Sequence, residues 1–456
     1  MFALSAKPQL IGEWSLPVAL TDSISKNANP VVAVYPNDDS ELYMFYEKGE
    51  EPFRQIWWKK ISEPMSEEQM FLGAWPEVDY RNPQILLYNF LIFECNVSGN
   101  YDFFGVKFDE NGLAGDIFQL TNTEFEERDL FPYTNDYSNL CCWVRGGNVY
   151  IAKPQQSQDS LILADSELID SGDCYDPVCQ ENYIAWRKVE NNESHIYYSQ
   201  KTYPSYQWTD PEYIIDTGDN INLAISITAL EFGGGYSLCW QTGDKIYFSE
   251  LNGSYLYTSE IPNVEKYYEP TAFNMLWVTD FMSDLYSFTG ETESVKDIYI
   301  VDEEVSNYIL NITNDAYVNK NPRLFIGRNV FEYVKYEIIN IWQTEINGYD
   351  VLYSSYSVYN VVIGGIDENK LSRFEIYPNP VSNQANIKIN LSELVEGEIS
   401  IFVLNNQGQK VEKIKMEGST SKKLDLVWNK GNLPSGVYYL VIKTRKEQIS
   451  EKFIIL

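Results

Sequence analysis

A repeat that runs along most of this 456-residue chain restricts its fold more than any other feature. Blocks of 45 to 53 residues each open with a short segment in which proline usually holds the second position. Repeats of this length indicate an array of small, similar units rather than one continuous core. The seven opening segments are NPVVAVY (Asn29), NPQILLY (Asn82), FPYTNDY (Phe131), DPVCQEN (Asp176), NLAISIT (Asn222), EPTAFNM (Glu269) and NPRLFIG (Asn321).

Two more runs of alternating polar and apolar residues follow each opening segment. Each block therefore predicts three short antiparallel strands. In the seventh block, Asn347-Gly348 between the second and third runs is a strong hairpin signal. Proline is expected at the first position of the first strand, where it need not donate to the ladder. The second run carries an aromatic residue in register, predicted to pack in the core between neighbouring repeats: Phe45, Phe93, Trp143, Trp186, Trp240, Phe288 and Trp342.

A fourth, outer strand follows in six blocks, and the N-terminus supplies the missing copy. Residues 10–22, LIGEWSLPVALTD, have the W-x-x-P-x-x spacing of YQWTDPEYIID in the fourth block. Pairing of this segment with the last repeat closes a ring and removes exposed sheet edges. The sequence therefore predicts an all-β fold in which residues 7–356 form a seven-bladed β-propeller closed by the N-terminal strand. The pattern leaves a count of six blades open.

The phrase W…IYYS…W-x-x-P-x-x after an N-P opening resembles the repeats of sialidase-like propellers, over roughly residues 10–356. That family carries an Asp-box turn, S-x-D-x-G-x-T-W, whereas the nearest copy here, SQKTYPSYQW at residues 199–208, lacks both the Asp and the Gly. The family's arginine triad has no counterpart either, since PFRQI at residues 52–56 falls in a third strand. The resemblance implies the fold and argues against sialidase activity.

Negative charge is concentrated in the repeats. The chain has a net charge of −32, and its first 373 residues carry 57 acidic against 23 basic side chains. Such a surface repels nucleic acid and anionic lipid, and it suits a neutral glycan, a cation or a basic partner. With no C-x-x-C pair and His195 as the single histidine, the sequence predicts neither a metal site nor a cofactor. Cys174 and Cys179 could pair in an exported protein.

The residues after 373 are nearly neutral and carry four motifs in a fixed order. These motifs are Tyr377-Pro378-Asn379-Pro380, N-x-x-G-x-x-V with Gly408, L-P-S-G-V-Y with Gly436 and Tyr438, and a terminus that begins at Lys452. The order resembles the type A C-terminal sorting domain of the type IX secretion system of Bacteroidota, over residues 373–456. Both glycines are expected in tight turns, and the alternating runs predict a small antiparallel β-sandwich over 374–456.

This resemblance implies that the type IX machinery is a partner of the chain. The protein would cross the periplasm and then be secreted or attached to the outer-membrane surface, with the tail removed or exchanged for a lipopolysaccharide anchor. Residues 357–373 are then a linker, and residues 1–6, MFALSA, read as the remnant of a signal peptide. No run of 18 apolar residues occurs in the sequence, so no transmembrane segment is predicted.

Polar residues flank the openings of the blocks, which gather around the axis of a propeller. Such groups can hydrogen-bond sugar hydroxyls or a basic peptide, although at these places they can equally cap turns. Asp176 and Glu269 could instead be a carboxylate pair for glycoside hydrolysis. The sequence favours a binding module for a glycan or protein ligand, and its alternative is a glycan-active hydrolase or lyase. The predicted ligand-binding set is Asn29, Arg81, Asn82, Asp176, Asn222, Glu269, Asn321 and Arg323.

Overall fold

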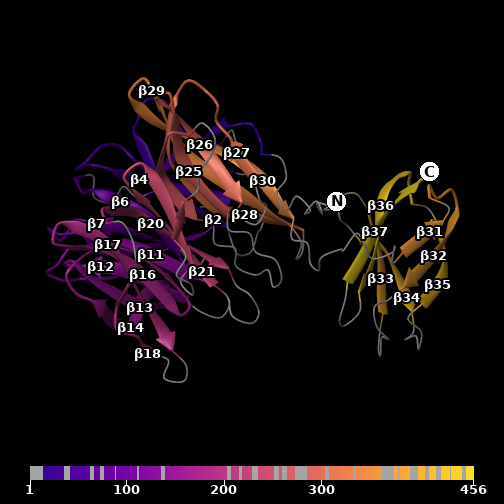
Figure 1. Cartoon of the computed structure of the whole chain (residues 1–456), viewed down its shortest axis with the longest axis horizontal. Coiled ribbons are helices and arrows are strands. Elements are labelled where there is room, and N and C mark those ends of the chain that lie inside the picture. Colours follow the sequence, from indigo (N-terminus) through magenta and orange to yellow (C-terminus); the bar gives the residue numbers. More distant parts are fainter. Residues whose placement is uncertain are drawn as a thin grey trace. The chain divides into compact units, whose positions relative to one another are not determined.

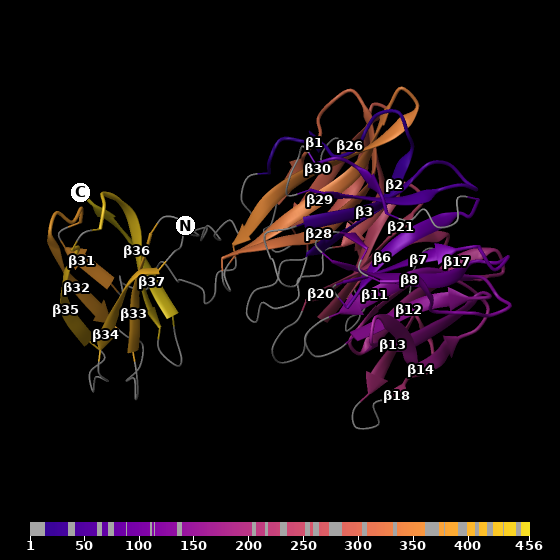
Figure 2. The same cartoon turned by 180° about the vertical axis from the view of Figure 1, so that it is seen from behind.

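The chain forms two compact units, Met1–Val361 and Val362–Leu456. The computed structural model describes residues 14–34, 42–61, 66–71, 77–87, 89–109, 112–113, 115–134, 139–202, 207–214, 218–228, 235–250, 256–258, 264–272, 285–302, 308–331, 335–360, 374–377, 379–390, 399–405, 410–416, 423–431, 433–443 and 448–456. Every regular element in these ranges is a β-strand, which confirms the predicted all-β class (Figure 1, Figure 2). The predicted signal-peptide remnant, residues 1–6, lies outside the described residues.

The described part of the first unit contains seven antiparallel sheets, and each begins with the opening segment of one repeat. Each of these first strands lies beside the first strand of the next sheet, and the last lies beside the first, so the series returns to its start. The first strands are β2 (Asn27–Val34), β6 (Tyr80–Leu86), β11 (Glu127–Thr134), β15 (Asp173–Gln180), β20 (Asn220–Thr228), β24 (Lys266–Ala272) and β28 (Val318–Phe331).

Every first strand contains a β-bulge at the same place. In β2, Asn29 and Pro30 lie together opposite the single residue Tyr46. The first bulge residue has φ between 46° and 58° in all seven strands, a left-handed conformation that Asn and Asp tolerate better than most residues. These residues are Asn29, Asn82, Asp129, Asp176, Asn222, Glu269 and Asn321.

The bulge corrects two expectations about the opening segments. Proline is not the first residue of its strand; it is the second bulge residue, where the ladder is interrupted and a missing N–H costs nothing. In the third repeat the bulge is formed by Asp129 and Leu130, two residues before the predicted Phe131-Pro132. The left-handed conformation, and not the proline, is therefore what all seven openings share.

The second strands bring one aromatic side chain opposite each bulge. In the first repeat this residue is Tyr46, so the predicted register at Phe45 is wrong by one position. The other six aromatic residues are as predicted, and each stacks on a third-strand ring at interplanar angles of 8° to 24°. The second strands are β3 (Leu42–Lys48), β7 (Phe90–Cys95), β12 (Asn139–Arg145), β16 (Tyr183–Glu190), β21 (Gly235–Thr242), β25 (Leu285–Thr292) and β29 (Lys335–Ile346).

These aromatic residues pack between neighbouring sheets, as predicted. Trp240, for example, is fully buried among Val178, Ala185 and Ile196 of the preceding sheet. The third strands, which supply the stacking rings, are β4 (Gln55–Lys60), β8 (Asp102–Asp109), β13 (Asn148–Ser157), β17 (Glu193–Thr202), β22 (Lys245–Glu250), β26 (Val295–Asp302) and β30 (Tyr349–Asn360). Since β30 runs to Asn360, the third strand of the last repeat extends into the segment predicted as a linker.

Most outer strands are much shorter than the sequence pattern indicated, because only β14 forms a long ladder with its neighbour. A further short strand, β9 (Gly112–Leu113), pairs with β8. The outer strands are β5 (Gln69–Met70), β10 (Phe118–Gln119), β14 (Ser160–Asp170), β18 (Gln207–Trp208) with β19 (Glu212–Tyr213), β23 (Leu256–Thr258), β27 (Tyr308–Asn311) and, for the last sheet, β1 (Val18–Ala19).

The N-terminal segment pairs with the third strand of the last repeat. Val18 and Ala19 lie opposite Ser354 and Tyr353 in an antiparallel ladder. The pairing extends beyond β1, since the backbone N–H of Leu20 donates to Leu352 O at 2.7 Å. The segment that precedes β2 therefore belongs to the sheet of the last repeat.

The six cysteines are free and buried. Cys174 and Cys179, the predicted candidate pair, lie on the same strand, β15, and face Lys188 and Ile184 of the neighbouring strand. The structure therefore does not join them in a disulfide. Burial raises the pKa of the Cys174 thiol to about 12, so the thiol is protonated at neutral pH.

The second unit contains two antiparallel sheets around one apolar core, which includes Trp428, Leu440 and Phe453. One sheet is β31 (Phe374–Tyr377), β32 (Gln384–Asn390) and β35 (Lys423–Asn429). The other is β34 (Lys410–Met416), β33 (Ile399–Asn405), β36 (Gly436–Lys443) and β37 (Gln448–Ile455). Two sheets packed on a common core form the small sandwich that alternation predicted.

The residues of the predicted sorting motifs serve different purposes in this unit. Tyr438 is buried and donates its hydroxyl to Pro434 O at 2.9 Å, while Asn379 Oδ1 accepts the N–H of Ile454 in the last strand at 2.9 Å. Tyr377 is exposed. Gly436 begins β36 and has no left-handed φ, so the tight turn predicted there is wrong. Pro380 is exposed and Lys452 lies in β37, whereas Pro378 and Gly408 lie outside the described residues.

Candidate functional site

The seven first strands surround a cavity of about 1120 Å³. Its wall includes residues from β2, β6, β11, β15, β20, β24 and β28, and the bulges bring polar side chains to its rim. Of the predicted ligand-binding residues, Arg81 and Asn82 do not line the cavity. Those that line it are Asn29, Asp176, Asn222, Glu269, Asn321 and Arg323.

The polar groups at this rim bond to one another across sheets. Glu47 Oε1 accepts the side-chain amide of Asn29 at 2.7 Å and the backbone N–H of Asn82, in the next sheet, at 2.6 Å. Glu94 repeats the arrangement one sheet further on, with Asn82 Nδ2 at 2.9 Å and the backbone N–H of Asp129 at 3.0 Å. Each glutamate therefore holds the bulge of its own sheet and that of its neighbour.

Gln241 makes the same two contacts in the fifth repeat. Its Oε1 accepts the Asn222 side chain and the backbone N–H of Glu269, both at 3.0 Å. The carboxylate of Glu269 then continues the chain of contacts, since Oε2 accepts the Thr289 hydroxyl at 2.9 Å and the backbone N–H of Asn321 at 2.5 Å. Glu269, one carboxylate of the predicted catalytic pair, therefore stabilises the bulge of the next sheet through this bond to Asn321.

Gln343 completes the series between the last and first repeats. Its Oε1 accepts the Asn321 side chain, and its Nε2 donates to Asn27 O at 2.7 Å. Arg323 joins the same two repeats because its Nη2 donates to Asn29 Oδ1 at 3.1 Å. Burial lowers the pKa of the Arg323 guanidinium. Glu47, Glu94, Gln241 and Gln343 are called the latch residues below.

Asp176, the other carboxylate of the predicted pair, also has a partner. Arg187 Nε donates to Asp176 Oδ2 at 2.9 Å, and the same guanidinium lies 4.5 Å from the centre of the Tyr175 ring. Asp176 and Glu269 line one cavity, as the enzyme alternative requires, but on β15 and β24, with β20 between them. Both carboxylates therefore stabilise the rim that they line.

Arg81 lies against the neighbouring repeat and not in the cavity. Its Nε donates to Glu94 Oε2 at 2.5 Å, its Nη2 donates to Glu126 at 2.7 Å, and its guanidinium lies 3.5 Å from the centre of the Tyr101 ring. Glu94 is almost completely buried, and this burial raises its pKa to about 7. Arg81 is consequently a structural partner of a buried carboxylate.

Acidic groups outnumber basic ones around the cavity. The basic residues are Lys26, Arg54 and Arg323, and the acidic residues are Glu47, Glu50, Glu51, Asp176, Glu269 and Asp350. Within the described ranges, no cluster of three or more His, Cys, Asp or Glu side chains is suited to a metal ion. The cavity therefore offers an excess of hydrogen-bond acceptors.

The latch residues were missed by sequence reasoning, although a signal for them exists. Each follows directly after the aromatic residue that lies opposite the bulge, and the remaining repeats have Val144, Arg187 and Thr289 at this position. The signal is visible only when the first repeat is aligned on Tyr46. When the first repeat is aligned on Phe45 instead, Glu47 lies one position after Glu94, Gln241 and Gln343 in the alignment, and the shared position is lost.

The second unit has a family match. Residues 375–456 match the family described as "Secretion system C-terminal sorting domain". This confirms the recognition that the four ordered motifs predicted, and it implies sorting by the type IX system and export to the cell surface or beyond. No helix in the described part of the chain has the length and hydrophobicity to cross a bilayer.

Solved structures similar to this chain share little sequence with it. One is PorZ from Porphyromonas gingivalis, described as an essential bacterial surface component of the type IX secretion system; it is 11% identical with a TM-score of 0.30, over 94% of this chain and 70% of PorZ. A puromycin-hydrolyzing peptidase from Mycobacterium tuberculosis is 10% identical with a TM-score of 0.41, over 84% of this chain and 61% of the peptidase. The Dos1 propeller is 9% identical with a TM-score of 0.41, over 77% of this chain and 96% of its own. No curated protein matches the chain.

Proposed function

We propose that residues 14–360 form a seven-bladed β-propeller, closed by β1, that acts as a secreted or cell-surface binding module. Residues 1–373, which include the linker to the sorting domain, would then be responsible for ligand binding. Residues 374–456 would direct the export of the protein. The observation that carries the proposal is the cavity of about 1120 Å³ to which all seven first strands contribute. A volume of this size suits an oligosaccharide or a peptide segment.

The contacts of the two candidate carboxylates support binding rather than catalysis. General acid–base catalysis needs a carboxyl group that is positioned to exchange a proton with the substrate. Asp176 forms an ion pair with Arg187, and Glu269 Oε2 accepts the Thr289 hydroxyl and the backbone N–H of Asn321, so both carboxylates have structural roles at the rim. A glycan-active enzyme remains the second candidate because both carboxylates line the same cavity.

The acidic excess of the lining favours a ligand rich in hydrogen-bond donors, either a basic peptide or a neutral glycan. Glu50 and Glu51 are exposed at this cavity and are not latch residues. Glu50 pairs with the exposed Lys26 at 3.1 Å, a contact that does not involve the bulges, so both glutamates can be changed without disturbing the bonds of the rim. Arg81 is unsuitable for such a test, since its removal leaves the buried Glu94 without its cation.

The full chain should be screened against a glycan array and a set of basic peptides. Glu50→Gln with Glu51→Gln is expected to weaken binding of the selected ligand by about tenfold and to leave the unfolding midpoint unchanged. Release of reducing sugar that disappears in Asp176→Asn or Glu269→Gln would instead establish the enzyme. Unchanged affinity in the double variant would place the ligand elsewhere.

Closure and export each have a separate test. Deleting residues 1–22 is expected to lower the unfolding midpoint of the whole first unit, because the deletion removes β1 and exposes the edge of β30. An unchanged midpoint would contradict closure. Deleting residues 374–456 is expected to leave the protein in the periplasm, and normal amounts in the medium or at the cell surface would contradict sorting by this domain.

A further inference from the structure

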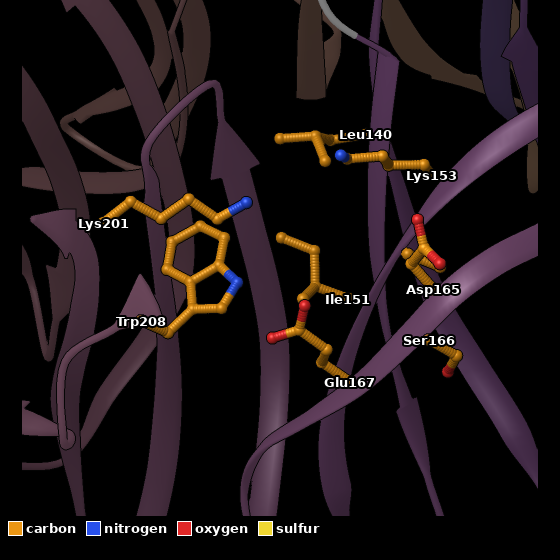
Figure 3. A pocket seen from close by; sticks show the side chains of 9 residues that line it. Leu140, Ile151, Lys153, Asp165, Ser166, Glu167, Lys201 and Trp208 are labelled. Atoms are coloured by element: carbon orange, nitrogen blue, oxygen red, sulfur yellow. The ribbon is translucent and has the colours of Figure 1, made fainter. Parts of the chain in front are cut away.

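A second pocket, of about 380 Å³, lies between the third and fourth sheets of the first unit. The β13–β14 hairpin forms one wall, and β17 and β18 of the following sheet form the other (Figure 3). Leu140, Ile151 and Ala152 are buried and provide an apolar base. This lateral pocket shares no lining residue with the axial cavity.

Two lysines enter the lateral pocket from opposite walls. Figure 3 shows the ammonium ends of Lys153, from β13, and Lys201, from β17, directed toward each other across the opening. Lys201 Nζ lies 4.8 Å from the centre of the Trp208 ring, which holds it in place. Burial and the charge of Lys153 both lower the pKa of Lys201. Two cations that repel each other favour an anion placed between them.

Neither lysine has a salt bridge within the described residues, although carboxylates line the same pocket. Lys48, Lys107 and Lys188 of the first unit, by contrast, each form a salt bridge. Lys153 is exposed and Lys201 is half-buried, so a ligand of opposite charge can reach both ammonium groups. The pair of lysines is therefore a candidate carboxylate site.

Trp208 adds a hydrogen-bond donor to this site. Its Nε1 is buried and has no acceptor among the described residues. The unpartnered N–H groups of Trp143 and Trp240 lie in the core, but Figure 3 shows that of Trp208 turned toward the pocket. A buried N–H without an acceptor costs free energy until a ligand or water satisfies it.

The opposite wall supplies acceptors from a bulge in β14. The ladder skips from the pair Ile151–Glu167 to the pair Lys153–Ala164, so Asp165 and Ser166 together lie opposite the single residue Ala152, and Asp165 has a φ of 52°. A bulge redirects side chains, and here Asp165, Ser166 and Glu167 all line the pocket. Three acceptor groups in a row suit several hydroxyls better than a single ammonium group.

We infer that the lateral pocket binds an acidic sugar, a hexuronate-sized polyol whose carboxylate lies between Lys153 and Lys201 and whose hydroxyls donate to Glu167 and Asp165. An inorganic dianion would satisfy the lysines but be repelled by the two carboxylates. A neutral hexose would leave the lysines unpaired. The volume of the pocket is sufficient for one or two sugar rings. This site is independent of the function proposed for the axial cavity.

The test is saturation-transfer NMR and calorimetric titration of the full chain with glucuronate and galacturonate. Glucose and galactose are the matched neutral sugars, and inorganic phosphate and glutamate are the alternative anions. Both hexuronates are expected to bind at least about tenfold more tightly than any of the other four compounds, the usual effect of a charge-assisted hydrogen bond.

Variants then locate the site. Lys153→Met and Lys201→Met keep the alkyl chains and should each weaken hexuronate binding by about tenfold or more. Lys107→Met, which removes a half-buried lysine paired with Asp159 outside the pocket, should have no effect, and neither should Glu50→Gln with Glu51→Gln. Equal binding of hexose and hexuronate, tighter binding of phosphate or glutamate, an unaffected lysine variant, or no saturable hexuronate binding would each overturn the inference.

Discussion

The axial cavity and the lateral pocket are both lined by polar side chains, but these side chains are used in opposite ways. At the axial rim, amides and carboxylates bond to each other from sheet to sheet, as Glu47 does with Asn29 and Asn82. In the lateral pocket, Lys153 and Lys201 show no salt bridge within the described residues, and Trp208 Nε1 has no acceptor there. Polar residues around the axis thus have structural partners, whereas the polar groups of the lateral pocket are the ones for which we propose a ligand.

This difference between the two regions follows from the free-energy cost of burying charged and polar groups. A buried carboxylate is stable only when several donors surround it, so the groups at the rim are fixed by their own network. A half-open pocket allows water to solvate charges that have no protein partner. Changes at the rim should therefore reduce stability, and changes in the lateral pocket should affect binding far more than stability.

The largest expected effect separates the two regions directly. Glu94→Ala at pH 8 should lower the free energy of unfolding by about 3–5 kcal/mol, because Arg81, Asn82 and the backbone N–H of Asp129 all lose their acceptor. Glu167→Ala, in the lateral pocket, should change it by less than about 0.5 kcal/mol. Urea unfolding of both variants checks this. Similar losses of unfolding free energy in the two variants would contradict the distinction between a structural rim and a ligand-binding pocket.

The pH dependence of stability should come partly from Glu94. Its pKa is about 7 in the folded protein, above the value of about 4.3 expected for an unfolded chain, so the folded state binds more protons between these values. Stability should therefore fall as pH rises from about 4.5 to 7, by at most about 1.4 kcal/mol per pH unit. Glu94→Gln should remove this part of the slope in urea titrations. A variant curve parallel to that of the wild type would contradict the assignment.

The left-handed bulge residues predict a smaller effect. Asn222→Ala should cost about 1–2 kcal/mol, because it removes the bond to Gln241 and the short polar side chain that lets asparagine tolerate a φ of 53° better than alanine does. Asn222→Gly removes the same bond without the conformational strain and should cost about 1 kcal/mol less than alanine. If glycine is as destabilising as alanine, backbone conformation is not what selects the residue.

The smallest effect belongs to the lateral pocket in the absence of ligand. Lys153→Met should raise the pKa of Lys201 and stabilise the fold by up to about 0.5 kcal/mol, because one repulsive contact disappears. NMR titration of the Lys201 amine and urea unfolding provide the measurements. A lower Lys201 pKa in this variant would mean that the two ammonium groups do not face each other.

Local patterns in the sequence determined most of the fold. The second and third strands of each repeat, the N-terminal strand on β30 and the two-sheet sorting domain all followed from alternation, aromatic register and turn residues. The errors occurred where local pattern is ambiguous. In LYMFYEKG, Phe45 and Tyr46 are adjacent aromatics, and a shift of one residue moves a strand's side chains to the other face.

The tertiary structure alone decided which polar residues bond to one another and which do not. Glu47 holds Asn82 across 35 positions of the chain, and the lateral pocket joins Lys153 to Trp208 of the next sheet. A repeat period specifies the strands within each unit but not the side-chain contacts between units, because these depend on the angle and spacing at which neighbouring sheets pack. The sequence therefore identified the ring of polar openings, and only the packed sheets revealed that those openings bond to one another while the lysines between two sheets do not.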